Sequence, residues 1–197
     1  TINITVPTGF LTEKQRQEII NEIKIDCSDL VKELNYFNQL PSNILKYIDD
    51  IREQLIDPED AAIKASEIGD KVQISYADIY KIYEDRLTQN SLVDYPRMIH
   101  FAYKAFAYDA SHDKSYISQF KHILIDEYQD INFAQKTMID ELLKGGASLW
   151  VVGDDDQAIY GWRGSSVKFI LEFENNYQDA KKVVLNTNYR SENKIVI

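Results

Sequence analysis

The chain has 197 residues, of which 44% are hydrophobic and 27% are charged, so a folded protein of one large or two small domains is expected. A net charge of −10 argues against a broad basic face that wraps nucleic acid, but it is compatible with a narrow groove that stacks bases on aromatic rings. No apolar run is long enough to cross a membrane, and the single cysteine, Cys27, excludes an intrachain disulfide and favours a cytoplasmic location.

The segment from residue 12 to about residue 110 is predicted to be all-helical, because its apolar residues recur at helical spacing. The eleven residues before it are short and β-branched, and they predict an edge strand or a loose end. Predicted helix starts are Thr12 with Gln15 as a capping box, Pro41–Ser42, Asp57–Pro58, Ser75–Asp78 and Asp94, and predicted stops are Gly69 and Asn90–Ser91. Residues 1–113 therefore predict a helical subdomain.

From Phe120 the pattern changes to short apolar runs separated by helical segments. Such an alternation predicts an α/β fold with parallel strands and right-handed crossovers over residues 114–197. The predicted strands are Ile123–Ile125, Leu149–Val152 and Val183–Leu185, and the predicted helices are one capped by Asn132 with Gln135 and ended by Gly145–Gly146, and one over Val167–Glu174. Each strand ends in polar residues, which predicts a site at one edge of the sheet.

Asp126 and Glu127 follow the first of these strands directly. Two adjacent carboxylates at a strand end are costly unless something pairs them, and a hydrated Mg²⁺ that takes one or two carboxylates and phosphate oxygens is one such partner. The second carboxylate would then deprotonate a water molecule. The alternative interpretation is a strand end with two solvated acids.

The loop after the second strand contains Gly153, which permits a tight turn, and Gln157, whose amide can sense a terminal phosphate. Tyr160, Trp162 and Arg163 follow within a few residues. Aromatic and guanidinium groups beside an acidic site suit stacking on nucleobases. Alternatively, Trp162 anchors the loop by packing beneath it.

Three consecutive acids follow Gly153, and they could form a metal site: Asp154, Asp155 and Asp156. The interpretation that we prefer is that Asp154 caps or braces the turn and that the other two are solvated. After the third strand, Tyr189 can stack on a base, and Arg190 can neutralise a transferring phosphoryl group or simply pair with one of the many acids.

These three blocks resemble, in order and spacing, motifs II, III and IV of the UvrD/Rep/PcrA-type superfamily 1 DNA helicases. The matching stretches are Asp126–Asp130, Val152–Gly164 and Leu185–Ser191. Upstream, Tyr80–Tyr83 and Leu92–Tyr95 loosely resemble the helical 1B subdomain of that family, although Pro96 and Arg97 stand where the family tends to have acids. The resemblance implies a partial RecA-like parallel sheet of the P-loop NTPase type, preceded by the helical subdomain.

The resemblance also implies a role for each matched residue. Asp126 would hold Mg²⁺, Glu127 would activate water, Gln157 would contact the γ-phosphate, Tyr189 would stack on adenine, Arg190 would act as an arginine finger, and Tyr160, Trp162 and Arg163 would line the single-stranded DNA track. The implied activity is ATP-dependent translocation on single-stranded DNA and unwinding of duplex junctions, as in DNA repair, with ATP and Mg²⁺ as cofactors and no membrane.

One feature of the family is missing: no Gly-x-x-x-x-Gly-Lys-Ser/Thr loop occurs in the 197 residues. The chain is therefore expected to be an internal fragment that lacks the preceding phosphate-loop segment and a following second RecA-like domain, and to be inactive in isolation. Two alternatives stay open: a non-hydrolysing, helicase-derived module that binds DNA or protein, and a Mg²⁺-dependent nuclease or phosphatase that uses Asp126, Glu127 and Asp154.

Overall fold

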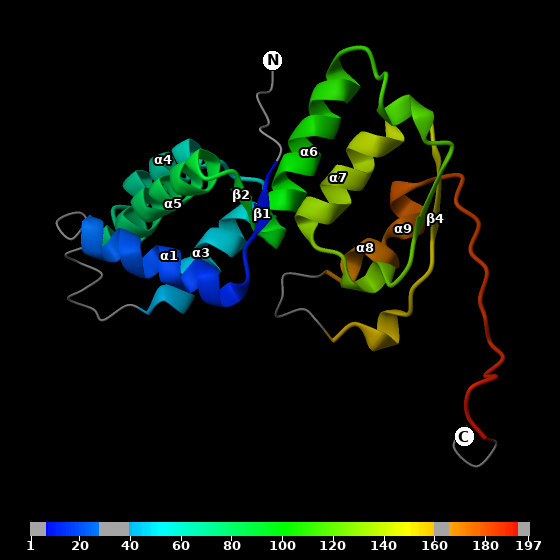
Figure 1. Cartoon of the computed structure of the whole chain (residues 1–197). Coiled ribbons are helices and arrows are strands. Elements are labelled where there is room, and N and C mark those ends of the chain that lie inside the picture. The colour runs from blue at the N-terminus through cyan, green and yellow to red at the C-terminus, as the bar shows by residue number, and fades with distance from the viewer. Residues whose placement is uncertain (1–6, 28–39, 160–165, 193–197) are drawn as a thin grey trace.

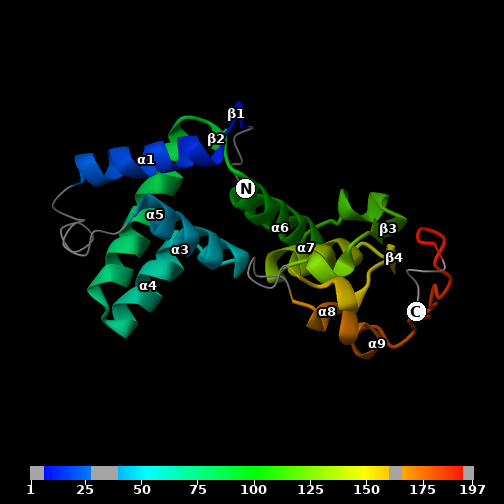
Figure 2. The same ribbon diagram turned by 90° about the horizontal axis from the view of Figure 1, so that it is seen from below.

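The computed structural model describes residues 7–27, 40–159 and 166–192. Figure 1 shows one group of helices, within residues 13–89, beside a second group in which the helices within residues 133–176 accompany a pair of parallel strands. The helix over residues 95–111 lies between the two groups and packs along the helix over residues 133–143, which the view from below also shows (Figure 2). The mostly helical architecture with small parallel sheets confirms the predicted class, while the division at residue 113 stays a prediction.

Local capping decides where the first helices begin. Thr12 and Gln15 exchange the two hydrogen bonds of a capping box, as predicted. Gly69 closes a later helix with φ of 75°, a conformation that suits glycine. The prediction for α5 was a few residues late, because the side chain of Asp70 accepts a hydrogen bond from the backbone of Val72. The helices of this group are α1 (Glu13–Asp26), α3 (Pro41–Glu53), α4 (Pro58–Ile68) and α5 (Lys71–Gln89).

The first group buries a continuous apolar core that includes Ile20, Ile44, Ile48, Ile79 and Leu87. A two-residue strand, β1 (Gly9–Phe10), pairs in parallel with β2 (Leu92–Val93) and closes one end of this core. β1 agrees with the edge strand suggested for the first eleven residues, whereas β2 was not expected within a helical segment.

A buried ion network fastens the start of α6 (Tyr95–Ser111) to this core. Asp94 is 0% exposed, and both of its carboxylate oxygens accept hydrogen bonds of 2.9 Å from Nη1 of Arg52. Nε of Arg16 lies 3.0 Å from Asp94 Oδ2, and the hydroxyl of Tyr83 donates to the same oxygen at 2.9 Å. Burial alone would raise the pKa of Asp94, but the charges of Arg52 and Arg16 hold it below its ordinary value.

The network extends outward through Glu84, which accepts from Arg52 on one oxygen and from Nε of Arg97 at 2.7 Å on the other. Arg97 also donates to the backbone oxygen of Leu92 at 2.6 Å. The arginine at this position, where the resemblance led us to expect an acid, is therefore paired on both sides. Asp94 was predicted from the sequence only as a helix cap, and it also fills that role by accepting from the backbone N–H of Arg97.

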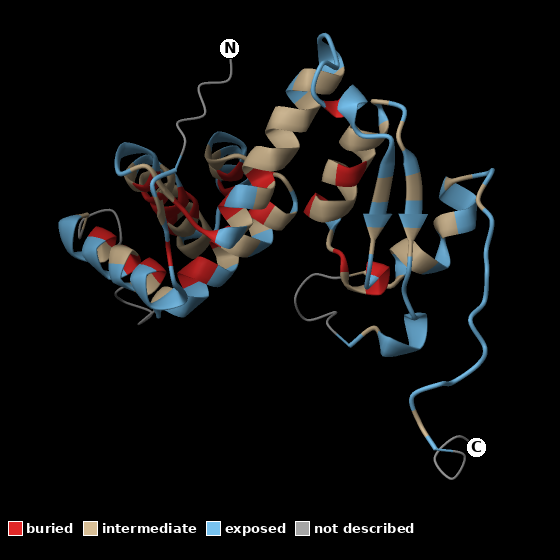
Figure 3. Cartoon of the chain, turned by 45° about the vertical axis from the view of Figure 1, so that its right-hand side comes forward, coloured by how far each residue is buried: buried red, intermediate tan, exposed pale blue. Residues whose placement is uncertain are grey.

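The second group is built on β3 (His122–Ile125) and β4 (Ser148–Val151), which pair in parallel as predicted. Between them, α7 (Phe133–Leu143) begins with a second capping box formed by Asn132 and Gln135. The single helix expected over 167–174 is two short helices, α8 (Lys168–Leu171) and α9 (Phe173–Asn176). One face of the strand pair packs on these helices, while Leu124 and Trp150, on the other face, are 77% and 65% exposed (Figure 3).

The predicted third strand is wrong for this structure. Residues 181–189 form neither helix nor strand, and Leu185 is 86% exposed. Figure 1 shows this segment running past the strand pair toward the C-terminus. A parallel strand is stable only when a neighbouring strand satisfies its backbone groups, and in the described residues no strand is paired beside 183–185. The apolar sequence is thus necessary for a strand but not sufficient.

Candidate nucleotide site at the ends of the paired strands

The acidic residues after β3 and the loop after β4 emerge side by side. Ile125 is in register with Val151, and the backbone ladder continues one step further. The N–H of Val152 donates to the oxygen of Ile125 at 2.8 Å, and the N–H of Tyr128 donates to the oxygen of Val152 at 3.0 Å. This extension confirms that the two polar strand ends meet at the same edge of the sheet, as parallel pairing requires.

Glu127 turns the chain sharply at this edge. Its φ of 52° and ψ of 43° place it in the left-handed region, which is uncommon for a residue other than glycine. The carboxylate of Asp126 accepts a hydrogen bond of 2.9 Å from the backbone N–H of Glu127 and so supports the turn. As a result both carboxylates stand exposed at the strand end.

A buried amide joins Glu127 to the neighbouring loop. Gln129 is 1% exposed, and its Nε2 donates to Oε2 of Glu127 at 2.7 Å. Its Oε1 accepts from the backbone N–H of Asp154 at 3.0 Å. No role was predicted for Gln129, although it lies within the Asp126–Asp130 motif. The two residues that it joins, Glu127 and Asp154, are 27 positions apart in the sequence.

The same contact explains Gly153. A Cβ atom at this position would lie 2.6 Å from Oε1 of Gln129 and 2.8 Å from Cδ1 of Ile170. The glycines with positive φ among the described residues are Gly69 and Gly146, so Gly153 is not there to supply a left-handed backbone conformation. Glycine is needed here because the amide of Gln129 approaches the backbone closely.

The side chain of Asp154 stabilises the loop after β4 through hydrogen bonds. This is the interpretation that we preferred to a metal site. Its Oδ1 accepts from the backbone N–H of Asp156 at 3.1 Å, and its Oδ2 accepts from Nε2 of Gln157 at 2.7 Å. Glu127, Gln129, Asp154 and Gln157 therefore form one hydrogen-bonded chain across the two strand ends. Two of the residues proposed from sequence, Glu127 and Gln157, are its ends.

Aromatic side chains pack around Tyr128, the residue that follows Glu127 at this edge of the sheet. Tyr128 is fully buried, and its ring meets that of Phe173 edge-on at 5.5 Å. The hydroxyl of Tyr177 donates to Asp140 at 3.1 Å, and Lys136 pairs with the same carboxylate at 2.6 Å. Burial, with Asp140 nearby, raises the pKa of Tyr128 to about 12, so this phenol is neutral at physiological pH.

The remaining predicted site residues are not joined to this chain of hydrogen bonds. Tyr189 is 93% exposed, and in the described part of the chain no hydrogen bond or ion pair links the side chain of Arg190 to Asp126, Glu127 or Gln157. Tyr160, Trp162 and Arg163 lie outside the described residues. The proposed roles of these five residues stay predictions.

The chemistry at Asp126 fits a hydrated Mg²⁺. Mg²⁺ retains several waters and takes one or two carboxylates together with phosphate oxygens, and an exposed aspartate at a strand end can supply one such ligand. Across residues 7–27, 40–159 and 166–192, no group of three or more His, Cys, Asp or Glu side chains is arranged to hold a metal ion by itself. Phosphate oxygens would have to complete the coordination.

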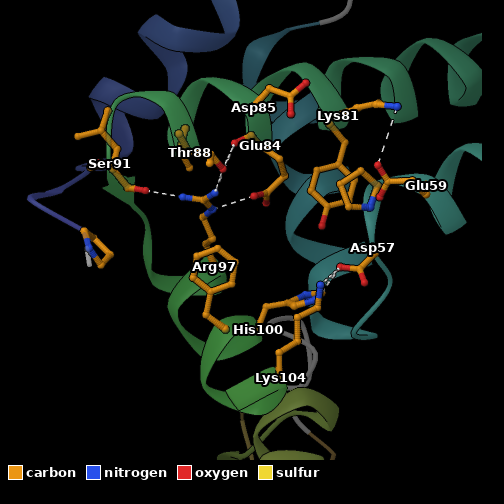
Figure 4. Close-up of a pocket in the computed structure, with 16 residues that line it drawn as sticks. Asp57, Glu59, Lys81, Glu84, Asp85, Thr88, Ser91, Arg97, His100 and Lys104 are labelled. Carbon is orange, nitrogen blue, oxygen red and sulfur yellow. Dashed lines mark hydrogen bonds and ion pairs between the residues drawn. The ribbon is translucent and has the colours of Figure 1, made fainter. Parts of the chain in front are cut away.

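A separate cavity of about 330 Å³ lies between α4, α5 and α6, away from the strand ends. Figure 4 shows Asp57 facing His100 and Lys104 on one side, and Arg97 reaching Glu84 and Thr88 on the other. The cavity mixes both signs of charge, and most of its charged groups are already paired with each other. It offers no cluster of one sign that would select a nucleotide.

Because of the ion pair at Asp57 in this cavity, the stability of the fold is expected to depend on pH. The imidazole of His100, whose Nε2 lies 3.1 Å from Oδ1 of Asp57, and then the Lys104 ammonium lower the pKa of Asp57 to about 2 against the opposing effect of burial. Because an aspartate in an unfolded chain has a pKa of about 3.9, this pair stabilises the fold fully above about pH 4, and the contribution is lost as the pH falls through about 2.

Asp57→Asn keeps the size of the side chain, which makes no capping hydrogen bond to α4, and removes its charge. We expect it to lower the free energy of unfolding at neutral pH, with a difference from wild type that shrinks between about pH 4 and pH 2. Urea unfolding at a series of pH values measures this, and a difference that is constant with pH would contradict it.

The paired parallel strands with acidic ends and the adjoining group of helices are consistent with a partial RecA-like domain joined to a helical part. The chain belongs to the family of the UvrD/REP helicase N-terminal domain, whose model matches residues 6–178. This match covers both groups of elements described above and confirms the family resemblance.

Curated relatives agree with this assignment. The chain is 36% identical over 156 residues to the ATP-dependent DNA helicase PcrA of Staphylococcus epidermidis, and 35% identical over 156 residues to that of Bacillus subtilis; each match covers 79% of this chain. It is 34% identical over 194 residues, 98% of this chain, to PcrA of Leuconostoc citreum. The matches span only 21% to 24% of the relatives' own lengths.

No helix in the part of the chain that the structure describes is long and apolar enough to cross a membrane.

Proposed function

We propose that this chain is part of an ATP-dependent DNA helicase, in which it supplies the hydrolytic carboxylates and the loop that couples hydrolysis to DNA. The observation that carries the proposal is the hydrogen-bonded chain from Glu127 through Gln129 and Asp154 to Gln157, at the shared edge of two parallel strands. Such a chain places a water-activating base and a phosphate-sensing amide in one connected unit.

In this proposal, Asp126 would hold Mg²⁺ when ATP is bound, and the bound metal would supply neutralising charge at the phosphates. Glu127 takes the proton from the attacking water, and Gln157 contacts the γ-phosphate. The phosphate-binding lysine and the second RecA-like domain come from segments of the protein outside this chain. That organisation agrees with the chain spanning about a fifth to a quarter of its curated relatives.

Arg190 and Tyr189 complete the nucleotide site in the whole protein, as an arginine finger and an adenine-stacking ring. Their exposure in this structure is compatible with that role, because an exposed ring and guanidinium are free to contact nucleotide held between two domains. Tyr160, Trp162 and Arg163 line the single-stranded DNA track, where aromatic rings stack on successive bases.

The decisive experiment is an ATPase assay of the full-length protein with and without single-stranded DNA. The proposal expects Mg²⁺-dependent hydrolysis that single-stranded DNA stimulates, and strand separation on duplexes with a single-stranded tail. Nucleotide or DNA binding without hydrolysis would favour a non-hydrolysing module instead. DNA cleavage with Mg²⁺ and no nucleotide would favour a nuclease.

Trp162→Ala in the full-length protein tests the proposed DNA track. We expect weaker binding of single-stranded DNA by about 1–3 kcal/mol, because a base loses its stacking partner. Fluorescence anisotropy with a labelled oligonucleotide measures the affinity, and a thermal melt measures the fold. A variant that keeps its DNA affinity but loses its melting transition would show that Trp162 is a structural anchor.

A further inference from the structure

We propose that Gln129 is a positioning residue, which orients the carboxylate of Glu127 and makes that orientation depend on the loop after β4. The inference rests on the proposed function, because it concerns the residue assigned as the water-activating base. It adds a residue to which neither the motif nor the proposed mechanism assigns a role.

The bridge between Glu127 and Asp154 requires a side chain that both donates and accepts a hydrogen bond. Glu127 can only accept a hydrogen bond, and the backbone N–H of Asp154 can only donate one. A side-chain amide offers a donor and an acceptor on the same carbon, so Gln129 satisfies both partners at 2.7 and 3.0 Å. The backbone donor fixes which end of the amide is oxygen, and the NH₂ group must then face Glu127.

The side-chain amide of Gln129 has little freedom to rotate. Gln129 is almost fully buried, so a rotation that broke either hydrogen bond would leave a polar group without a partner, at a cost of about 1–3 kcal/mol. Glu127, by contrast, is exposed and held in the left-handed region of backbone conformation. The buried amide therefore fixes the exposed carboxylate.

The loop after β4 closely approaches the amide of Gln129. At Gly153 a Cβ atom would lie only 2.6 Å from Oε1 of Gln129, so glycine allows the loop to rest directly on the amide. A displacement of the backbone at Gly153 and Asp154 withdraws the donor that holds Oε1, and the NH₂ group facing Glu127 moves with it. The loop position thus determines whether Glu127 is aligned.

The test uses the full-length protein and measures kcat, the KM for ATP and the melting temperature of each variant. We expect Gln129→Ala to lower kcat by about ten- to a hundredfold, since misplacing a catalytic group by about 1 Å has an effect of that size. The KM for ATP stays within about twofold, because Gln129 does not touch the nucleotide.

The Gln129→Glu variant distinguishes two roles of Gln129: orienting Glu127 and supporting the loop after β4. Glutamate keeps an oxygen that accepts from Asp154 but presents an oxygen, not a donor, to Glu127. Positioning requires a kcat as low as that of Gln129→Ala. If Gln129→Glu retains wild-type kcat, the residue only supports the loop and the inference is overturned.

A double-mutant cycle tests the contact without relying on activity. Gly153→Ala is expected to lower the melting temperature in the wild-type background, and to lower it less in the Gln129→Ala background, where the clash with Oε1 is gone and that with Cδ1 of Ile170 remains. Equal effects in both backgrounds would overturn the proposed contact.

The two proposals fail in different ways. If the wild-type protein hydrolyses ATP and Glu127→Gln abolishes hydrolysis, but both Gln129 variants keep wild-type kcat, only the positioning role falls. If wild-type protein does not hydrolyse ATP, the proposed function is wrong, and so is the role of Gln129. If it hydrolyses ATP but Glu127→Gln is as active as wild type, the base is another residue, and only the role of Gln129 in orienting it is overturned.

Discussion

Glu127→Gln is expected to lower the kcat for DNA-stimulated ATP hydrolysis by the full-length protein by about 10²- to 10⁴-fold, the contribution of a positioned general base. Glutamine has nearly the same size as glutamate but cannot take a proton from water. It can still place its side-chain oxygen where Oε2 of Glu127 now accepts from Gln129, so the turn and the bridge are preserved. ATP affinity should therefore change little.

Steady-state turnover and equilibrium binding of a non-hydrolysable ATP analogue measure the two parts of this expectation. Glu174→Gln is the matched control, because it makes the same chemical change at an exposed position on α9. The control should keep wild-type turnover. A Glu127→Gln protein with wild-type kcat would assign the base to another residue, while one that no longer binds nucleotide would give Glu127 a binding role.

Asp94→Ala is expected to be the most destabilising single change in the helical part, by about 3–5 kcal/mol of unfolding free energy. The aspartate is completely buried, and its removal leaves Arg52 and Arg16 with buried positive charges that lose their common partner. The same change removes the cap at the start of α6, which adds about 1 kcal/mol.

Asp94→Asn separates the two contributions. The amide oxygen still caps the N–H of Arg97, so the destabilisation that persists measures the ion network. Asp50→Ala is the control: its pair with Lys46 is exposed, and such pairs contribute at most about 1 kcal/mol. Urea unfolding followed by circular dichroism gives the free energies. An Asp94→Ala protein as stable as the Asp50→Ala control would show that the network contributes no net stability.

Some features were predictable because their causes are local. The capping boxes at Thr12 and Asn132 each join residues three positions apart, so the sequence predicts them directly. The apolar runs at 123–125 and 149–151 are short, continuous and followed by acids, which predicts parallel strands with a site at their ends. Asp126, Glu127 and Gln157 were identified as site candidates on that basis.

Other local patterns gave wrong or incomplete predictions. Val183 to Leu185 have the composition of a strand, but a strand also needs a neighbour, and neighbours are not encoded in the segment itself. Asp94 was recognised as a cap, but its partnership with Arg52 joins residues 42 positions apart. Gly153 was assigned to a turn, whereas its neighbour in space is Gln129.

The family resemblance, most helix ends, the parallel pairing of the two strands and the carboxylates at their edge were all predictable from the order of the residues. These features depend on spacing, capping and apolar runs within a few residues. Three contacts became visible only in the folded chain: Gln129 bridges Glu127 and Asp154, Gly153 makes room for that amide, and Asp94 pairs with buried arginines. Each of these contacts joins residues brought together by packing, and hydrogen-bond geometry and burial are set only when the chain has folded.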